Sequence, residues 1–167
     1  MSMVRWSLHQ FGELTPPDLY ELLTLRSAVF VVEQQCVFLD VDNKDQQSWH
    51  LLGKINNQLV AYTRLLPAGL AYESCSIGRV VTADTVRRTG VGKLLMEESI
   101  NCCEKLFGKA AIEIGAQLYL EKFYQSFGFK QVGLRKDYYP ASRTNREAAV
   151  VMSMPISRPE MQTPAPR

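Results

Sequence analysis

The chain has 167 residues, of which 46% are hydrophobic and 22% are charged, and its formal net charge is +2 at pH 7. This length and composition predict one compact domain with its own core, and so small a positive charge argues against a nucleic-acid partner. No apolar run approaches the roughly 20 residues that cross a bilayer, and the first residues lack the apolar stretch of a signal peptide. We therefore expect a cytoplasmic protein that binds neither membrane nor nucleic acid.

Local turn and cap residues place the first predicted elements. Thr15 and Pro16 suit the cap and the first turn of a helix that continues to about Phe30. The pair Asn56-Asn57 favours a hairpin turn, because asparagine tolerates positive φ. Apolar periodicity completes the pattern. The other predicted helices are 90–107 and 118–127, and the predicted strands are 4–9, 49–55, 59–66, 76–82, 110–114, 129–134 and 148–154.

This order of elements is typical of an α/β (α+β) domain built on a single mixed sheet. We assign residues 1–155 to that domain. The segment 156–167 is rich in proline, and we expect it to be a flexible tail.

The four cysteines are expected to be packed free thiols. None of Cys36, Cys75, Cys102 and Cys103 forms a C-x-x-C pair, and the adjacent Cys102 and Cys103 point to different faces of any helix. Because metal-ligand spacing is missing, we expect no metal site.

The segment 34–47 carries three acidic residues, Asp40, Asp42 and Asp45. It has neither the central glycine nor the closing glutamate of a calcium loop. We expect a solvated acidic loop with at most a short helix. Electrostatic steering of a cationic amine is an alternative role for the same charges.

The strongest local motif follows the predicted strand 76–82, where Gly90 and Gly92 open a helix behind Arg87 and Arg88. Backbone N–H groups at a helix start bind phosphate, glycine lets it approach closely, and arginine adds bidentate contacts. The spacing fits neither a Walker loop nor a G-x-G-x-x-G dinucleotide motif, since Leu94 and Leu95 occupy the deciding positions. A helix start with solvated arginines remains the structural alternative.

Arg87-x-x-Gly90-x-Gly92 resembles the Q/R-x-x-G-x-G/A pyrophosphate motif of the GNAT (GCN-five-related) acetyltransferases. A second stretch, 117–129, is similar to the N-x-x-A-x-x-x-Y-x-x-x-G-F pattern of that family. Tyr124, Gly128 and Phe129 match it, whereas Gln117 and Leu120 replace the usual Asn and Ala.

The segments 25–36 and 60–67 resemble the ElaA-like branch of this family, although 138–147 lacks the acidic-Gly-Ile-Pro-His segment of such chains. A weaker likeness links Arg26-x-x-Val29-Phe30, the acidic segment and Arg64-Leu65-Leu66-Pro67 to the acyl-homoserine-lactone synthases. We attribute that likeness to shared architecture.

The resemblance implies a GNAT fold, in which a single mixed, mostly antiparallel sheet is flanked by helices on both faces. It also implies transfer of an acetyl group from acetyl-CoA to a primary amine, of a small molecule or a protein, by direct attack in a ternary complex. Tyr124 would act as the general acid, although a core aromatic is the structural alternative. The implied cofactor-binding residues are Val80, Val81, Thr82, Arg87, Arg88, Thr89, Gly90, Val91, Gly92, Lys93, Gln117 and Tyr124.

The general base and the acceptor stay open. Many relatives use a glutamate on the strand before the phosphate turn, and that strand here offers Ser76 and Arg79 but no carboxylate. Two other functions therefore remain as alternatives: an acyl-CoA-binding or regulatory module without catalysis, and an acyltransferase related to the lactone synthases. Homodimers are common among relatives and are possible here. The candidate bases are Glu33, His50, Glu73 and Glu113.

Overall fold

The structure is a computed structural model that describes residues 3–134 and 149–155. It divides into two compact units, Met1–Gly108 and Lys109–Arg167, which are treated separately below. The predicted tail at 156–167 and the segment 138–147 lie outside the described residues. In the described part of the chain, no helix is long and apolar enough to cross a membrane.

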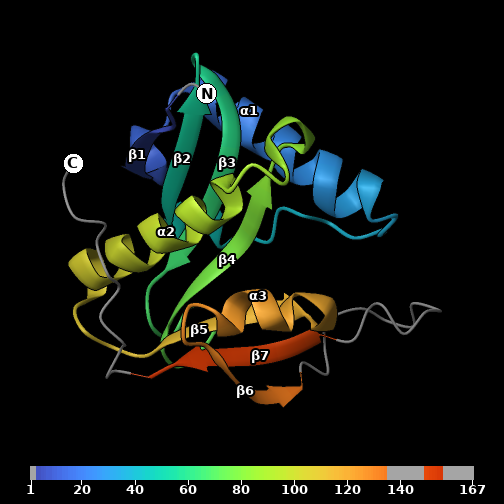
Figure 1. Cartoon of the computed structure of the whole chain (residues 1–167). Helices are drawn as coiled ribbons and strands as arrows, with labels where there is room; N and C mark the ends of the chain where they lie inside the picture. The colour runs from blue at the N-terminus through green and yellow to red at the C-terminus, as the bar shows by residue number, and fades with distance from the viewer. Residues whose placement is uncertain (1–2, 135–148, 156–167) are drawn as a thin grey trace, which may run out of the picture. The chain divides into compact units, whose positions relative to one another are not determined.

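Four antiparallel strands form the sheet of the first unit, in the order β1-β2-β3-β4 (Figure 1). The turn between β2 and β3 is built by Asn56 and Asn57, whose φ angles of 50° and 63° are left-handed, as the sequence predicts. The strand bounds are β1 Arg5–Gln10, β2 Trp49–Ile55, β3 Gln58–Leu66 and β4 Cys75–Thr82.

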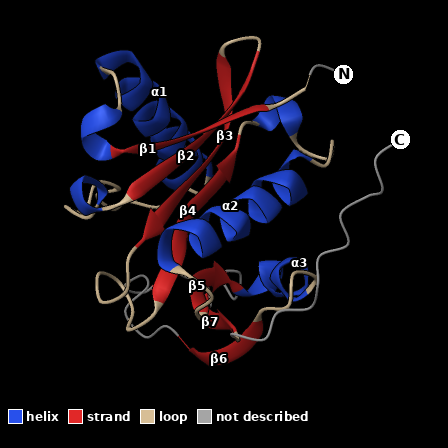
Figure 2. Cartoon of the chain, turned by 90° about the vertical axis from the view of Figure 1, so that its left-hand side faces the viewer, coloured by secondary structure: helices blue, strands red, loops and turns tan. Residues whose placement is uncertain are grey.

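Two helices, α1 Pro16–Arg26 and α2 Val91–Phe107, cover opposite faces of this sheet (Figure 2). Leu22 of α1 packs in a core cluster that includes Tyr62 of β3. Ser99 of α2 hydrogen-bonds the next residue of β3, Thr63, at 2.7 Å between the two hydroxyl oxygens. Because neighbouring side chains of a strand point to opposite faces, α1 and α2 lie on the two sides of β3.

The ends of these helices follow the predicted signals. The Thr15 side chain caps α1 by accepting a hydrogen bond from the Asp18 N–H at 3.2 Å. Gly108 ends α2 with a φ of 77°. After Arg26 the chain continues as a π-helix, Ser27–Glu33, which the sequence pattern does not distinguish from α-helix. Short 3-10 helices cover Phe11–Glu13, Asp45–Gln47 and Asp84–Val86.

The second unit contains three antiparallel strands in the order β5-β7-β6. The predicted strand at 110–114 is shifted along the chain: β5 begins two residues later, at Ile112, and extends to Gln117. The predicted helix at 118–127 is a 3-10 turn, Leu118–Leu120, followed by a short α3, Glu121–Gln125. The strands are β5 Ile112–Gln117, β6 Lys130–Leu134 and β7 Ala149–Met154.

Candidate functional site

The turn between β4 and α2 has the backbone geometry of an anion-binding turn. Gly90 is the N-cap of α2 with a φ of 90° and has no side chain to cap the helix. The first α-helical hydrogen bond runs from the Leu94 N–H to the Gly90 oxygen at 3.2 Å. The first N–H groups of a helix have no acceptor within it and lie at its positive end, so they suit an anion.

Space and charge around this turn also fit a phosphate. A Cβ atom built on Gly90 would meet no atom within 4 Å, so the space above its backbone is open. Arg87 and Arg88 are exposed, and 71% of the Lys93 side chain is exposed. The residues present therefore fit the diphosphate of coenzyme A. Their contacts with it stay a prediction.

Arg87 is bound to an acidic partner that the sequence did not reveal. Its two terminal nitrogens donate to the two carboxylate oxygens of Glu33, the last residue of the π-helix, and the Nη2–Oε2 distance is 2.7 Å. Both side chains are partly exposed, at 38% for Arg87 and 46% for Glu33. The hydrogen bond from Arg87 lowers the pKa of Glu33, which makes its carboxylate a weaker base.

A β-bulge interrupts the strand that leads into the turn. Between the pairs Tyr62–Val81 and Arg64–Gly78 the register of β3 and β4 shifts, and Arg79 lies in the shifted stretch. The φ of Arg79 is 50°, a left-handed value that is uncommon for a residue with a side chain. Bulges bend a strand and redirect the backbone beside them.

The residues predicted to pair with the pantetheine arm follow directly after this bulge. Val81 is buried and packs in the core of the first unit, whereas Val80 and Thr82 are half-buried. Their backbone contacts with a cofactor stay a prediction.

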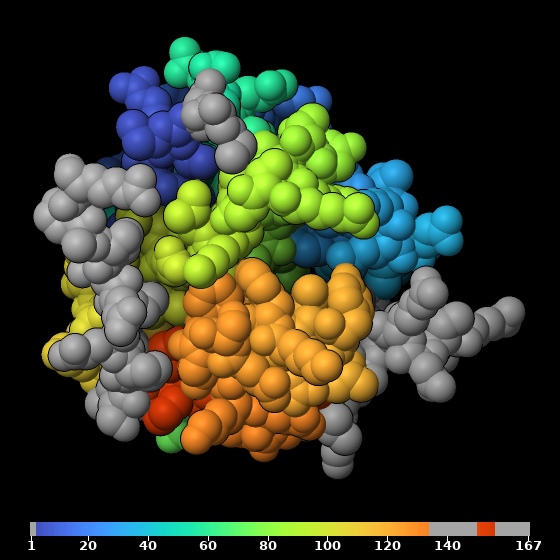
Figure 3. Space-filling view, in the orientation of Figure 1, coloured from blue at the N-terminus to red at the C-terminus, as the bar shows by residue number. Residues whose placement is uncertain are grey.

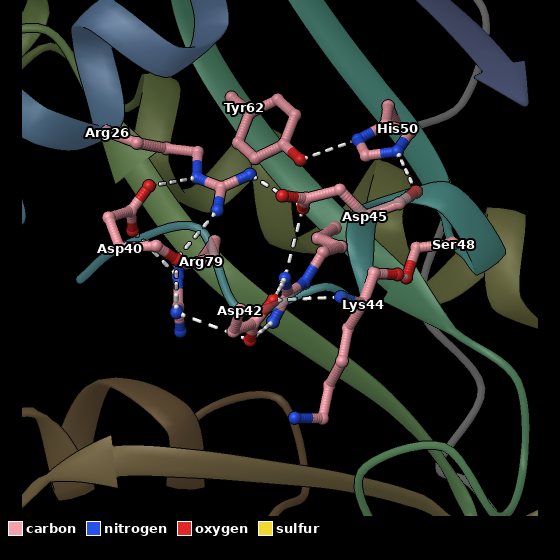
Figure 4. Close-up of polar contacts among 10 residues, drawn as sticks. Arg26, Asp40, Asp42, Lys44, Asp45, Ser48, His50, Tyr62 and Arg79 are labelled. Carbon is pink, nitrogen blue, oxygen red and sulfur yellow. Dashed lines mark hydrogen bonds and ion pairs between the residues drawn. The ribbon is translucent and has the colours of Figure 1, made fainter. Parts of the chain in front are cut away.

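The acidic segment is not the solvated loop expected from sequence. Its carboxylates bind arginines from α1, β3 and β4 (Figure 4). Asp40 and Asp45 are each only 6% exposed, and Arg26 is fully buried. The arginine–aspartate cluster consists of Arg26, Arg64, Arg79, Asp40, Asp42 and Asp45.

Asp40 and Asp45 are each shared between two arginines. Asp40 accepts from Arg26 Nε at 2.8 Å and from Arg79 Nε at 2.9 Å, and its backbone oxygen accepts from Arg79 Nη2 at 2.9 Å. Asp45 accepts from Arg26 Nη1 at 2.7 Å and from Arg64 Nη1 at 3.0 Å. Because buried charges need such partners, the cluster ties the segment 34–47 to the sheet.

Arg64 and Asp42 complete the cluster through a bidentate pair, with N–O distances of 2.7 and 2.9 Å. Burial raises the pKa values of Asp42 and Asp45, but hydrogen bonds and positive charge from the arginines outweigh burial. Both pKa values therefore lie below the ordinary 3.8.

His50 is disfavoured as the general base. Its ring is fully buried, and both ring nitrogens are in hydrogen bonds: Nε2 with the Asp45 carbonyl oxygen at 2.9 Å and Nδ1 with the Tyr62 hydroxyl at 2.7 Å. A carbonyl oxygen only accepts, so Nε2 carries the proton and Nδ1 accepts from Tyr62. Burial lowers the pKa of His50, and its one free lone pair is already used.

The remaining base candidates lie in different places. Glu73 is exposed in the turn before β4, Glu113 is half-buried on β5, and Glu33 binds Arg87. The geometry of the described residues selects none of them.

Two predicted site residues belong to the second unit. Gln117 is the last residue of β5 and pairs with Ala149 of β7. Tyr124 on α3 is 4% exposed, and its ring packs edge-on to Phe123 and Phe129 at centroid distances of 5.2 and 6.1 Å. Tyr124 therefore packs as a core aromatic residue would, and its role as proton donor stays a prediction.

The cysteines have the burial expected of packed side chains. Cys75, Cys102 and Cys103 are buried and Cys36 is half-buried, and none of these four cysteines forms a disulfide. Among residues 3–134 and 149–155, no group of three or more His, Cys, Asp or Glu side chains is arranged to hold a metal ion.

Comparison with known proteins gives the family. The family "Acetyltransferase (GNAT) domain" matches residues 29–138, which is more than half of the chain. The chain belongs to the GNAT acetyltransferases. It is 41% identical over 129 residues to the protein ElaA of Escherichia coli, covering 76% of this chain and 84% of ElaA, so the ElaA-like assignment is confirmed.

Solved structures confirm the predicted fold class. The crystal structure of Escherichia coli ElaA superimposes with a TM-score of 0.80 at 36% identity, covering 90% of this chain and 99% of that one. An acyl-CoA N-acyltransferase from Pseudomonas aeruginosa gives 0.79 at 33% identity, with the same coverage. A GNAT acetyltransferase from Elizabethkingia anophelis, solved with acetyl-CoA bound, shares the fold at 0.64 and 20% identity, covering 91% of this chain and 97% of that one.

Sequence reasoning predicted that a helix begins at Gly90, where the structure caps α2, but it missed the arginine–aspartate cluster, the bulge at Arg79 and the Glu33–Arg87 pair. Phosphate binding at this turn stays a prediction. A signal for the cluster was present, because the likeness to the lactone synthases already grouped Arg26, the acidic segment and Arg64. The bulge and the Glu33–Arg87 pair left no comparable pattern in the sequence.

Proposed function

We propose that this protein is a cytoplasmic N-acetyltransferase that moves an acetyl group from acetyl-CoA to a primary amine by direct attack. The observation that carries the proposal is the turn at Gly90, where an open, left-handed glycine caps a 17-residue helix behind two exposed arginines. Membership in the GNAT family supports the same reaction class.

The cosubstrate supplies an activated acyl group as a thioester. In this proposal the first N–H groups of α2, with Arg87, Arg88 and Lys93, hold the diphosphate. The backbone of 80–82 hydrogen-bonds the pantetheine arm as an added strand would, and the side chain of Gln117 contributes a further hydrogen bond.

The chemical step needs little more than positioning and one proton donor. The amine nitrogen forms a bond to the carbonyl carbon as the carbon–sulfur bond breaks, and the amine gives up a proton to solvent or to a base. The Tyr124 hydroxyl donates its proton to the departing thiolate, for which a phenol is a suitable acid at neutral pH.

A heat-stability measurement with acetyl-CoA tests the proposal. At about 100 times the dissociation constant, a ligand that binds only the folded state stabilises it by about 2.7 kcal/mol. For a chain of this length we expect the melting temperature to rise by about 5–10 °C. No rise at millimolar acetyl-CoA would contradict the proposal.

The variant Gly90→Glu should lose this rise, because its side chain is strained at positive φ and its carboxylate repels phosphate. Gly69→Glu is the matched control: Gly69 also has a left-handed φ, 87°, and open space at its Cβ position. The control carries the same backbone strain and should keep the rise with acetyl-CoA.

A second function, acyl-CoA binding without turnover, is favoured by one observation: β4 offers no carboxylate to act as a base. Release of the free thiol of coenzyme A in the presence of amines distinguishes an acetyltransferase from a binding module. A protein that is stabilised by acetyl-CoA but releases no thiol with any amine would be a binding module.

A further inference from the structure

The bulge in β4 changes the direction in which Arg79 points. β4 has two residues, Arg79 and Val80, where β3 has one, Thr63. Residues paired across a regular antiparallel ladder share a face of the sheet, and Thr63 points to the face that α2 covers, where it contacts Ser99. An unbroken ladder would therefore direct residue 79 toward α2.

The side chain of Arg79 lies on the other face, in the arginine–aspartate cluster (Figure 4). Its Nε donates to Asp40 Oδ1 and its Nη2 to the Asp40 backbone oxygen, both at 2.9 Å. Asp40 also binds Arg26, the last residue of α1, and the Arg26 guanidinium lies over the ring of Tyr62 on the α1 face of β3. The bulge and the contact between Arg79 and Asp40 therefore occur together.

The backbone of Arg79 has a conformation that needs support. Its φ of 50° is left-handed, and in bulges that begin with a left-handed residue this residue is ordinarily glycine. Other residues keep such a conformation only where surrounding contacts hold them. Asp40 supplies contacts of this kind, because it is buried, is itself held by Arg26 at 2.8 Å and accepts twice from the Arg79 guanidinium. Asp42 adds a longer contact, at 3.4 Å.

The bulge also decides which backbone groups of the next residues face β3. After the bulge, Val81 pairs with Tyr62 and Thr82 pairs with Ala61. Without the extra residue this pairing would slip by one position, and such a slip exchanges the backbone groups and side chains on the two sides of a strand. Val81, which is 3% exposed and packs with Leu22, would then turn out of the core.

The stretch 80–82 lies between two ionic contacts with the segment that follows α1. Asp40 binds Arg79 at the bulge before this stretch, and Glu33 binds Arg87 in the turn after it. In Figure 3 the light-blue surface of the segment lies beside the yellow-green surface of the turn. The segment therefore contacts β4 and its turn before and after the residues proposed to pair with the pantetheine arm.

Resting on the proposed function, we propose that Asp40 is a positioning residue for the cosubstrate. Its hydrogen bonds to Arg79 hold the bulge, and the bulge presents the backbone of 80–82 to the pantetheine arm. Asp40 acts through this backbone and does not itself touch the cosubstrate.

Calorimetric titration with two ligands tests the proposal. Acetyl-CoA has the pantetheine arm, whereas 3′-phosphoadenosine 5′-diphosphate is the nucleotide half of coenzyme A without that arm. In Asp40→Ala we expect acetyl-CoA to bind about tenfold more weakly, which corresponds to the loss of one or two hydrogen bonds, while the nucleotide binds as it does to the wild type.

Asp45→Ala is the matched control. Asp45 is as buried as Asp40 and is also shared between two arginines, but these are Arg26 and Arg64. Asp45→Ala should therefore lower the stability of the protein and leave its affinity for both ligands unchanged.

The variants Arg79→Gly and Arg79→Ala distinguish the bulge from the side chain. Both remove the guanidinium, but only glycine adopts a left-handed φ without an anchoring contact. We expect Arg79→Ala to weaken acetyl-CoA binding as Asp40→Ala does, and Arg79→Gly to keep most of the affinity. Added to Asp40→Ala, Arg79→Gly should restore acetyl-CoA binding, which a role of Asp40 in stability alone does not predict.

Several results would overturn the inference. Equal weakening in Arg79→Gly and Arg79→Ala would mean that the side chain matters and the bulge does not. Equal loss in Asp40→Ala and Asp45→Ala, or loss of the nucleotide together with acetyl-CoA, would reduce Asp40 to a structural role. The two Arg79 variants keep Asp40 bound to Arg26, so they decide the matter even if Asp40→Ala does not fold.

Failure of the inference is distinguishable from failure of the proposed function. If acetyl-CoA binds the wild type and binds Asp40→Ala equally well, the inference alone fails. If acetyl-CoA neither binds nor stabilises the wild type, the proposed function fails and the inference falls with it.

Discussion

At the scale of single residues, Tyr124 is the group whose removal separates chemistry from binding. The change Tyr124→Phe keeps the ring that packs against Phe123 and Phe129 and removes the hydroxyl group that would donate the proton. A positioned general acid contributes about 10²–10⁴ in rate. We therefore expect kcat to fall by at least about 100-fold while the affinity for acetyl-CoA changes little. Tyr119→Phe, at an exposed tyrosine of the same segment, is the control. Unchanged turnover with saturating amine would exclude Tyr124 as the donor.

Glu33 is the residue whose removal should improve cofactor binding. Its ionised carboxylate occupies both terminal nitrogens of Arg87, the group proposed to hold phosphate. A partly exposed ion pair is worth only about 0.2–1 kcal/mol, so we expect Glu33→Gln to tighten acetyl-CoA binding about 1.5- to 5-fold, and less at high salt. Calorimetric titration at two salt concentrations measures this.

Asp84→Asn is the control for this prediction, because it removes an acidic side chain from the 3-10 helix next to Arg87 and leaves the Glu33–Arg87 ion pair in place. If Glu33→Gln weakens binding instead, Glu33 holds Arg87 in position for the phosphate and does not compete with it. An equal gain in both variants would mean that only the general negative charge matters.

At the scale of elements, the arginine–aspartate cluster joins the segment 34–47 to α1, β3 and β4. Asp45 is shared by Arg26 and Arg64, so Asp45→Asn leaves two buried guanidinium groups short of negative charge. Removing one partner of a buried pair typically costs about 3–5 kcal/mol of unfolding free energy. Urea unfolding at pH 7 checks the loss. Asp84→Asn, outside the cluster, should change stability little.

The same cluster predicts a stability that falls in acid. The pKa values of Asp42 and Asp45 are lower in the folded protein than the ordinary 3.8, so the unfolded chain binds protons first as the pH drops. Their contribution is complete above about pH 5 and is lost progressively as the pH falls below it. In Asp45→Asn, the free energy of unfolding should fall less steeply with decreasing pH when it is measured from pH 3 to 7. An unchanged slope would show that other groups cause the acid sensitivity.

Elements set by neighbouring residues were predictable, whereas contacts between distant residues were not. Thr15, the Asn56-Asn57 turn and Gly108 act within a few positions of the chain, and each has the predicted geometry. The partners of Asp40 lie 14 and 39 residues away, in Arg26 and Arg79, and no local rule joins them. In the candidate site, too, the local motif was predictable and the contacts between distant residues were not.

The glycine-containing start of α2 is a local motif and could be predicted from spacing, whereas its binding of phosphate stays a prediction. The bulge at Arg79 lies where Asp40 binds the Arg79 side chain, and only the folded chain brings these two residues together. The shift of β5 has a local cause: the run from Ala110 to Ala116 is apolar with two interruptions, so periodicity did not fix where the strand begins.

At the scale of the whole molecule, the proposed cofactor residues are divided between the two compact units. Residues 80–93 belong to the first unit, and Gln117 and Tyr124 belong to the second. If both groups bind the cosubstrate, acetyl-CoA must slow amide hydrogen exchange in both, because exchange follows local opening and ligand contacts suppress it. Exchange of the full chain, with and without acetyl-CoA, measures this segment by segment, and β1 serves as the internal control. We expect slower exchange in 80–93 and in 117–124, with little change in β1. Protection confined to 80–93 would keep the phosphate turn and remove Gln117 and Tyr124 from the site, so the proton donor would have to be sought in the first unit.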